Sequence, residues 1–512
     1  MGQLSSGALI GLILSVILVI IFIWGNQDDD EHVNDNPQNY LEAFQVAMEF
    51  FQVQKAGKLV NNTISWRGDS ALKDGGQDGL DLSKGMYDGG DHIKSSLPMA
   101  FTATMLSWAI LEYGDHMSLV KQLEPARDAI KWITDYLINA HPSPNVLYIQ
   151  VGNPEVDHNC WEKPETMDEN RPLFYINETN PGSDAAGEAS AALASASIVF
   201  KKIDPKYSKK LLTHAQQLHT FAMTYTGSYT TSFPKMQNSF NSSGFRDEIL
   251  WSSIWLYHAT HNKTYLSYLQ KVRDDQNYEG LAGMSLLGWD DKSSGAQLLM
   301  SRLSFFETGP MKTSEQLVLD YKCYTDIYFC KILPDAPFHS SELSKSGLLW
   351  GDDTNPLQYP VAQAFLILLY SDYMLTSNTE KINCKYEHSY TAADFRKFAI
   401  QQVNNVLGQN AKRMSYLVGY GKKYPQFVHH RGASIPADEN PSCKEGFDWL
   451  NSTKPNPNIA SGALVGGPNI DGEFSDERRN RKQLEPTTYN SALLVAVLSA
   501  LISTSTVNQT FI

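Results

Sequence analysis

Cysteine is scarce in this chain, and basic residues are outnumbered by acidic ones. The 512 residues include five cysteines, whose wide spacing excludes a metal cluster of the Cys-x-x-Cys type. Their odd number leaves at least one thiol unpaired within a monomer. The formal net charge is -14, and binding to phosphates needs a basic face, so we exclude a nucleic acid partner.

The N-terminus carries a long apolar run. Gly7 to Trp24 is uncharged over 18 residues, and at about 1.5 Å per residue this length just crosses a hydrocarbon core of about 30 Å. We therefore expect a short tail at residues 1–6, a transmembrane signal anchor at 7–24 and an acidic stalk at 25–38. The predicted protein is a single-pass type II membrane protein, with its body in the secretory lumen or outside the cell.

A cleaved signal peptide, which would give a secreted protein, is the alternative. It normally has a basic start and a shorter apolar core. This chain has no Lys or Arg before Lys55. Six Asn-x-Ser/Thr sequons favour the secretory pathway under either interpretation and are candidate N-glycosylation sites: Asn61, Asn177, Asn241, Asn262, Asn451 and Asn508.

Helical periodicity dominates the rest of the chain. Apolar residues recur at helical spacing in about twelve segments, and hardly any segment alternates as a strand would. No linker divides residues 39–512, so we predict one all-α domain there. The predicted helices are Leu41–Gln54, Pro98–Tyr113, Pro125–Ala140, Asp184–Lys202, Lys206–Tyr225, Asp247–Thr260, Thr264–Val272, Gly295–Phe306, Ser314–Tyr321, Leu357–Leu375, Ala392–Leu407 and Thr487–Ser503.

Three long loops separate these helices. They are Trp66–Leu97, Pro142–Gly182 and Lys422–Leu484, and loops of such length in a compact domain are usually functional. Paired helices that close into a ring would place connecting loops at one rim, where distant acids could meet.

The first loop contains Asp88-Gly-Gly-Asp91. Such a sequence is most often a polar surface turn, and a calcium loop is a second interpretation, although it would need more oxygen ligands. Two carboxylates three residues apart could also hold one water molecule, with one removing its proton and the other orienting it.

A second acidic segment contains Asp476 and Glu485 near the C-terminus. Pro486 suits the first position of the last helix and would leave Glu485 extended just before it. A helix-start acid stabilised by the helix dipole is the commoner situation. Cleavage of a glycosidic bond, however, uses one carboxyl group as proton donor and another that manages a water molecule or attacks.

Between the two acidic segments, Val428-His-His-Arg431 follows a Gly-rich, aromatic stretch that suits a wall for sugar hydroxyl groups. The side chains of Trp161, Trp251, Trp255 and Trp289 could stack on sugar rings. For each Trp taken singly, core packing is the commoner role.

These motifs resemble family 9 glycoside hydrolases, the cellulases of plants and bacteria. Tyr87-Asp-Gly-Gly-Asp-His-Ile-Lys resembles the family's opening block, and Ser415 to Arg431 resembles its first active-site signature. Asp157-His-Asn-Cys-Trp161 and Trp289-Asp290 match as well. The resemblance covers nearly all of residues 38–505 and is closest to the membrane-anchored, KORRIGAN-type endo-1,4-β-glucanases of plants, through Trp66-Arg-Gly-Asp and Lys454-Pro-Asn-Pro-Asn.

The resemblance implies an (α/α)₆ barrel and inverting hydrolysis of β-1,4-glucan without a cofactor. A structural calcium ion remains possible, with no assignable ligands. By position, Asp91 would be the general base, Asp88 its partner in holding the water, and Glu485 the general acid. The other residues implied in the cleft are His429, Asp476, Arg431, His158, Trp251, Trp289 and Trp161.

Three positions depart from the family pattern. Arg481 replaces an expected aromatic residue, Ser491 replaces Asn, and Gly89 stands where Ala is usual. The ionisable groups are intact, so an active enzyme is predicted. The alternative is a catalytically silent carbohydrate-binding protein of the same fold. A different inverting barrel enzyme, such as a calcium-dependent mannosidase, is a further option that the matched motifs disfavour.

Overall fold

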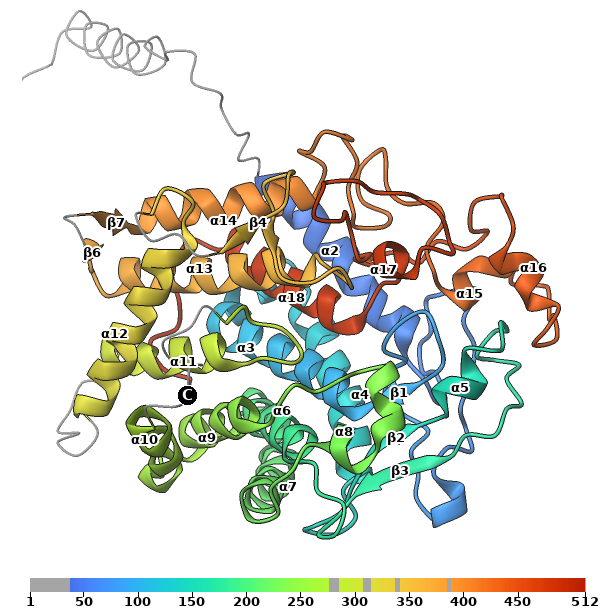
Figure 1. The fold of residues 1–512 in the computed structure, drawn as a ribbon, viewed down its shortest axis with the longest axis horizontal. Coiled ribbons are helices and arrows are strands. Elements are labelled where there is room, and N and C mark those ends of the chain that lie inside the picture. The colour runs from blue at the N-terminus through green and yellow to red at the C-terminus, as the bar shows by residue number, and fades with distance from the viewer. Residues whose placement is uncertain (1–36, 276–284, 307–314, 337–340, 385–387, 512) are drawn as a thin grey trace, which may run out of the picture. The chain divides into compact units, whose positions relative to one another are not determined.

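A computed structural model describes residues 37–275, 285–306, 315–336, 341–384 and 388–511. The chain divides into a short unit, residues 1–39, and a large unit, residues 40–512. The large unit is built mostly from helices, and its strands are few and short (Figure 1).

Six of the described helices form a closed inner ring in which each packs against the next, and the last returns to the first. Several of them, such as α13 and α18, are buried along nearly their whole length, because an inner helix meets protein on every side. In ring order they are α3 (Ser96–Leu119), α6 (Ser183–Phe200), α9 (Arg246–Thr260), α11 (Ser293–Phe306), α13 (Gln358–Thr376) and α18 (Thr488–Leu501).

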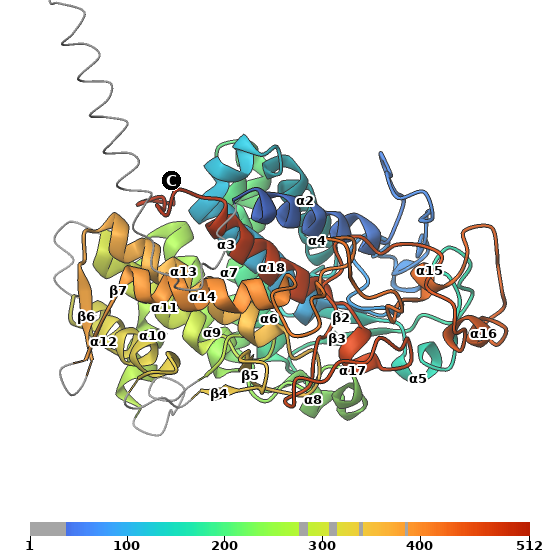
Figure 2. The same cartoon turned by 90° about the horizontal axis from the view of Figure 1, so that it is seen from above.

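The remaining long helices lie outside this ring (Figure 2). Five of them pack against the inner helix that precedes them in the chain, whereas α2 packs less extensively against its neighbouring helices. The arrangement of inner and outer helices fits an (α/α)₆ barrel. The outer helices are α2 (Pro37–Gln54), α4 (Leu123–Asn139), α7 (Pro205–Thr224), α10 (Leu266–Asp274), α12 (Glu315–Ile332) and α14 (Ala392–Val406).

Closure of the ring brings α3 and α18 side by side (Figure 1). The hydroxyl group of Thr102 in α3 donates a hydrogen bond to that of Thr488 in α18, over 3.0 Å. The loop before α3 carries Asp88 and Asp91, and the residues before α18 include Glu485. Two acidic segments nearly 400 residues apart therefore approach each other at the same end of adjacent helices.

A small antiparallel sheet supports this end of the barrel. β2 (Leu147–Val151) pairs with β1 (Lys94–Ser95) on one side and β3 (Leu173–Ile176) on the other. β1 begins three residues after Asp91, and β2 leads into the segment that contains His158. Pairing of Lys94 with Val151 thus fixes these two parts of the site relative to each other.

Short elements complete the described chain. Two further hairpins pair β4 (Glu342–Leu343) with β5 (Leu349–Trp350) and β6 (Lys381–Asn383) with β7 (Ser389–Thr391). The short helices are α5 (Pro154–Asp157), α8 (Tyr229–Ser232), α15 (Arg431–Ser434), α16 (Gly446–Leu450) and α17 (Arg481–Leu484), with 3₁₀ turns at Gly76–Asp78, Pro234–Asn238 and Lys263–Tyr265.

All twelve predicted helices are present, most within two or three residues of their predicted ends. Two lengths are wrong: α12 continues to Ile332 rather than ending at Tyr321, and α3 continues to Leu119, past a kink at Tyr113 where it was predicted to end. Two starts are also wrong. Gly182, not Ser183, precedes α6, and the side chain of Thr487 caps α18, so that Pro486 lies outside the helix. Most of the strands were missed because they are two or three residues long, and β2 was missed because all five of its residues are buried and so do not alternate.

Two disulfides join distant segments, Cys160 to Cys443 and Cys330 to Cys384, and Cys323 is exposed with a free thiol. The predicted anchor and most of the predicted stalk fall outside the described residues. Within the described ranges, none of the helices combines the length and apolarity that crossing a membrane requires.

A buried lysine stabilises the turn that carries Trp289. The ammonium group of Lys292 is fully buried, lies 2.8 Å from Glu248 and 3.7 Å from Glu188, and donates to the carbonyl oxygen of Trp289. Burial lowers the pKa of Lys292, but the charges of the two glutamates outweigh it and raise the pKa above its ordinary value. The two ion pairs of Lys292 thus join the Trp289 turn to the inner helices α6 and α9.

We expect Lys292→Met to destabilise the fold by about 3–5 kcal/mol, because it leaves the buried carboxyl groups of Glu248 and Glu188 without their cationic partner. Chemical denaturation of the variant measures this loss. The double variant Lys292→Met/Glu248→Gln replaces the nearer of the two buried carboxyl groups by a neutral amide and should recover part of the stability. Equal losses in the single and double variants would contradict this account.

Candidate active site

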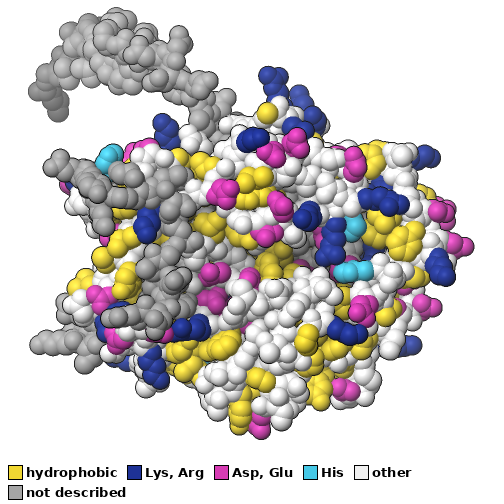
Figure 3. Space-filling model, viewed as in Figure 1, with side chains coloured by type: hydrophobic (Ala, Val, Ile, Leu, Met, Phe, Trp, Pro, Cys, Tyr) yellow, Lys and Arg dark blue, Asp and Glu magenta, His cyan; other side chains and the backbone are white. Residues whose placement is uncertain are grey.

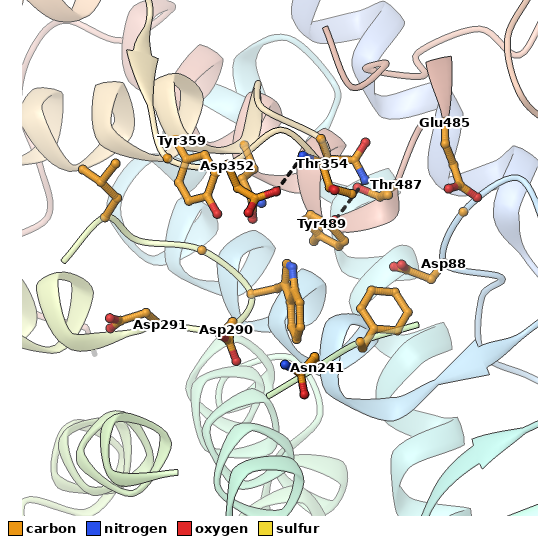
Figure 4. A pocket seen from close by; sticks show the side chains of 18 of the residues that line it. Asp88, Asn241, Asp290, Asp291, Asp352, Thr354, Tyr359, Glu485, Thr487 and Tyr489 are labelled. Carbon is orange, nitrogen blue, oxygen red and sulfur yellow. Dashed lines mark hydrogen bonds between the residues drawn. The ribbon is translucent and has the colours of Figure 1, made fainter. Parts of the chain in front are cut away.

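An open cleft of about 720 Å³ lies at the end of the barrel where α3 and α18 begin. Asp88, Asp91 and Glu485 all line it, together with residues from the Trp289 turn and the segment before α13. In Figure 4, Asp88 and Glu485 lie on one side of this pocket and Asp291 on the other. The face in Figure 3 is hollowed across its middle, where acidic side chains gather.

Backbone hydrogen bonds join the three segments that form the catalytic end of the cleft. The amide of Arg431 donates to the Gly90 carbonyl over 3.1 Å, and the amide of His429 donates to the Leu484 carbonyl over 3.0 Å. The amide of Gly90 in turn donates to Oε1 of Glu485 over 3.3 Å. The predicted convergence of the three loop motifs is therefore present.

Asp91 is held in its ionised form. Its Oδ1 accepts the amide of Ile93 over 3.0 Å, and its Oδ2 lies 3.2 Å from Nε2 of His158. Burial opposes ionisation, but the hydrogen bond and charge of His158, with the charge of Arg431, lower the pKa of Asp91 to about 2. The hydrogen bond to Asp91 raises the pKa of His158 in return.

Asp88 has the opposite electrostatic environment. Burial raises its pKa to about 8, and the neighbouring charges of Asp91 and Glu485 add to this rise. A hydrogen bond of 2.8 Å from the Thr488 hydroxyl opposes it. At neutral pH the loop thus carries one protonated and one ionised carboxyl group, because local surroundings separate two chemically identical side chains.

Glu485 lies between α17 and α18 in the extended conformation predicted for it, with φ -78° and ψ 119°. Its Oε2 accepts a hydrogen bond of 2.7 Å from Nε of Arg481, one turn earlier in the chain. Arg481 also lines the cleft, with 45% of its side chain exposed. This departure from the family pattern therefore places a positive charge directly beside the predicted general acid.

The other two departures have local explanations. A Cβ at Gly89 would lie 2.8 Å from Oε1 of Glu485, so glycine leaves room for the position that this carboxyl group takes. Ser491 is buried in α18, and its hydroxyl group contacts the backbone of Gly462 and Leu464 over 3.4 Å. Ser491 is therefore a packing position away from the cleft.

Arg431 lies behind the catalytic loop, which corrects its prediction as a sugar-binding residue. It is 2% exposed, and its two terminal nitrogens bond the two carboxylate oxygens of Asp157 over 2.8 and 2.6 Å. Nδ1 of His429 lies 2.6 Å from the Arg478 carbonyl oxygen. Since that oxygen can only accept, the proton of His429 is on Nδ1 and its Nε2 is an acceptor.

Asp476 organises the backbone. Its two carboxylate oxygens accept the amides of Gln426 and Phe427 over 2.8 and 3.0 Å. Asp476 is absent from the residues that line the cleft. It therefore fixes the loop that leads to His429, and a direct role in the cleft is not supported.

The predicted aromatic residues separate into three locations. Trp289 lines the cleft and packs edge-on against Phe240. Trp161 is 4% exposed and lies against His429. Trp251 is fully buried between Trp108 and Trp255, so its prediction as a substrate-binding residue is wrong. A buried indole at helical spacing cannot be distinguished from an exposed one by sequence alone.

Sequence reasoning missed two residues that shape the site. Asp157 neutralises Arg431, and Thr488 bonds Asp88. Asp157 lies in the matched Asp157–Trp161 motif, and Thr488 lies in the predicted last helix. A polar residue at the start of an apolar helix, such as Thr488, resembles an ordinary cap. Thr488 instead donates its hydroxyl hydrogen to the carboxyl group of Asp88.

One group of side chains in the described ranges has metal-ligand geometry. The ligand atoms of Asp91, Asp157 and His158 lie within 4.8 Å of one another. Arg431 already pairs with both oxygens of Asp157, so a metal ion here would face an existing positive charge. The three residues therefore fit a hydrogen-bonded ion-pair network better than a cation site.

Comparison with known proteins decides the family, since residues 40–498 match glycosyl hydrolase family 9. The chain belongs to this family. It is 56% identical to Endoglucanase 24 of Oryza sativa subsp. japonica, over 92% of this chain and 89% of that protein.

Solved family 9 structures share the fold. A termite endoglucanase from Nasutitermes takasagoensis is 35% identical, with a TM-score of 0.79 over 91% of this chain and 98% of that one. The cellulase Cel9M of C. cellulolyticum, solved in complex with cellobiose, is 27% identical, with a TM-score of 0.76 over 93% and 99%. Nothing in these likenesses or in the cleft favours the silent alternative.

Gly90 packs closely against the His429 segment of this family 9 site. A Cβ there would lie 1.9 Å from the His429 carbonyl oxygen, whereas a Cβ at Gly76 would meet nothing within 4 Å. We expect Gly90→Ala to lower kcat/KM at least about a hundredfold, because displacement of catalytic groups by about 1 Å has effects of that size. Gly76→Ala is the matched control and should retain activity. Steady-state kinetics on a soluble cello-oligosaccharide checks both, and wild-type activity in Gly90→Ala would contradict the packing described.

Proposed function

We propose that this chain is an endo-1,4-β-glucanase that hydrolyses internal bonds of β-1,4-glucan with inversion. One observation carries the proposal: Asp91, Asp88 and Glu485, from opposite ends of a family 9 chain, line a single open cleft. The curated relatives named endoglucanases and the solved cellulase with cellobiose support the choice of substrate.

Asp91 is the general base in this proposal. Its carboxylate accepts a proton from the water molecule that attacks the anomeric carbon. A pKa of about 2 keeps Asp91 ionised at neutral and mildly acidic pH. Asp88, with its pKa of about 8, is neutral in the same range and orients the water through its carboxyl group.

Glu485 is the general acid and protonates the glycosidic oxygen as the bond breaks. Inversion requires the two carboxyl groups to stand about 6.5–9.5 Å apart, with water between one of them and the sugar. Proton NMR of the first product identifies the outcome, since inversion of a β-linkage yields the α-anomer. A β-anomer would reject this mechanism. Activity that persists after a chelator has removed calcium would exclude a calcium-dependent mannosidase.

The cellular setting is part of the same proposal. The uncharged segment 7–24 anchors the protein as a type II membrane protein, and the catalytic body acts on cell-wall glucan from the lumenal or outer side. Asn61, Asn241, Asn262 and Asn451 are exposed, as glycan acceptors must be, whereas the Asn508 amide donates to the Leu111 carbonyl over 3.2 Å. Alkaline extraction of membranes separates an anchored from a secreted product.

The three carboxyl groups should respond differently to amide substitution. Asp91→Asn and Glu485→Gln remove groups that transfer protons, and each should lower kcat by at least about a thousandfold. Asp88→Asn resembles the neutral acid and should lower kcat by only about tenfold to a hundredfold. Rates on a defined cello-oligosaccharide, with circular dichroism to verify folding, test this ranking. Equal losses for Asp88→Asn and Asp91→Asn would contradict the division of roles.

His158 should set the acid side of the pH profile. In the native protein, the charge of His158 and its hydrogen bond both lower the pKa of Asp91. His158→Gln removes the charge and weakens the hydrogen bond, so the pKa of Asp91 should rise in the variant. Asp91 must be ionised to act as a base, and the acid limb of kcat/KM should therefore move to higher pH. An acid limb that stays in place would show that another group controls it.

A further inference from the structure

A cluster of lysines lies where α6 ends and α7 begins. Five of the residues from 201 to 210 are lysines, although the chain as a whole has 42 basic and 56 acidic residues. The net charge of -14 therefore conceals one strongly basic patch. We call this patch the lysine turn, and its members, all exposed, are Lys201, Lys202, Lys206, Lys209 and Lys210.

The lysine turn lies at the end of the barrel away from the cleft. Asp184, at the start of α6, accepts the amide of Tyr229, just after α7, over 3.0 Å. The segment that follows Tyr229 reaches the cleft, which Gln237 lines. The turn joins the opposite ends of these two packed helices (Figure 1). Since α6 has 18 residues, about 27 Å of helix separates the turn from the cleft side.

The positive charge of the turn is not neutralised by neighbouring acids. Within the described ranges, none of the five lysines forms an ion pair, although Lys84 and Lys131 both pair with Asp135 nearby. Asp204 is the one acid inside the turn, and its carboxylate caps α7 by accepting the amide of Tyr207 over 3.0 Å. None of the 20 residues of α7 is acidic.

Three of the lysines are placed against the stability of the fold. A cation at the end of a helix is favourable, which explains Lys201 and Lys202 at the end of α6. Lys206 instead lies in the first turn of α7, where a cation opposes the helix dipole. Lys209 and Lys210 follow it three and four residues later as like charges on the same face. Stability therefore does not explain these three lysines.

The chemistry of the patch favours a polymer with repeating negative charges. Lysine-rich segments of this length are typical of surfaces that bind polyanions such as nucleic acids and heparin. A lysine ammonium is a point charge without the fixed fork of arginine, so it tolerates carboxylates at varying positions. Anionic lipids concentrate in the cytoplasmic leaflet, whereas the catalytic body is proposed to lie on the other side.

We propose that the lysine turn binds an anionic polysaccharide, a chain of linked uronic acid units, while the cleft remains open to glucan. The carboxylates of such a chain pair with the exposed ammonium groups. The inference adds a second carbohydrate site to the glucanase, and the choice of partner rests on the proposed lumenal or outer setting. Because the two sites are at opposite ends of the barrel, the enzyme can be held on one polymer while it cleaves another.

Binding to polygalacturonate tests the proposal. Full-length protein in a neutral detergent is titrated on the immobilised polymer, and wild type should bind with an affinity that falls as salt is added. Lys206→Gln/Lys209→Gln/Lys210→Gln should bind at least about tenfold more weakly, because three exposed charges are lost. Its Tm should stay equal or rise, since the same charges oppose the helix dipole. Its kcat/KM on a cello-oligosaccharide should be unchanged.

The matched control is Lys58→Gln/Lys73→Gln/Lys412→Gln. It removes the same net charge from three exposed lysines elsewhere on the surface and should bind polygalacturonate as wild type does. Equal weakening in the two triple variants would reduce the effect to net charge and overturn the inference. Wild type that does not bind the polymer would overturn it as well.

Two further measurements locate the bound polymer. A saturating cello-oligosaccharide should leave polygalacturonate bound, and displacement would place the polymer in the cleft and overturn the inference. Ile203, which is 50% exposed in the same turn, would add apolar contact on a lipid surface. A lysine variant that loses affinity for anionic vesicles but keeps it for polygalacturonate would therefore assign the turn to lipid. Failure of wild type to cleave the cello-oligosaccharide would reject the proposed function and leave the binding result intact.

Discussion

The packing of α3 against α18 is the constraint on which the site depends. Each helix is preceded by acidic residues, and ring closure brings their N-terminal ends together. The hydrogen bond from Thr102 to Thr488 and the one from Thr488 to Asp88 continue this contact from the core to the catalytic end. Groups separated by nearly the whole chain are therefore positioned by a rigid scaffold.

Electrostatic surroundings then give the same side-chain type different tasks. Asp91 faces His158 and the Arg431–Asp157 pair, whereas Asp88 is buried beside two other carboxyl groups. Positive charges around the first stabilise its anion, and negative neighbours with low hydration favour the proton on the second. The residues behind the cleft matter as much as those in it, because they determine which acid is charged.

Much of this architecture was predictable from sequence. The helices follow from periodicity, since an amphipathic or wholly apolar pattern over three turns is a strong local signal. The same signal ended α12 too early at Tyr321. It also could not reveal β1, whose two residues show no alternation. The meeting of the Asp88 loop with Glu485 was predicted through recognised motifs, because residue spacing alone does not determine ring closure.

Individual side-chain environments were the least predictable. Trp251 and Trp289 look alike in sequence, yet one lies in the core and the other in the cleft. Arg431 looked suited to binding sugar, and its pairing with Asp157 depends on a contact between residues 274 positions apart.

The disulfide between Cys160 and Cys443 has a consequence for when the enzyme becomes competent. Cys160 lies two residues after His158, and the amide of Trp161 donates to the Cys443 carbonyl over 3.0 Å. The disulfide therefore holds the segment that contains His158, the residue that bonds the general base Asp91. In a reducing compartment both thiols would be free, and the barrel could fold with this tether open. Oxidation of this pair therefore completes the positioning of the segment that contains His158.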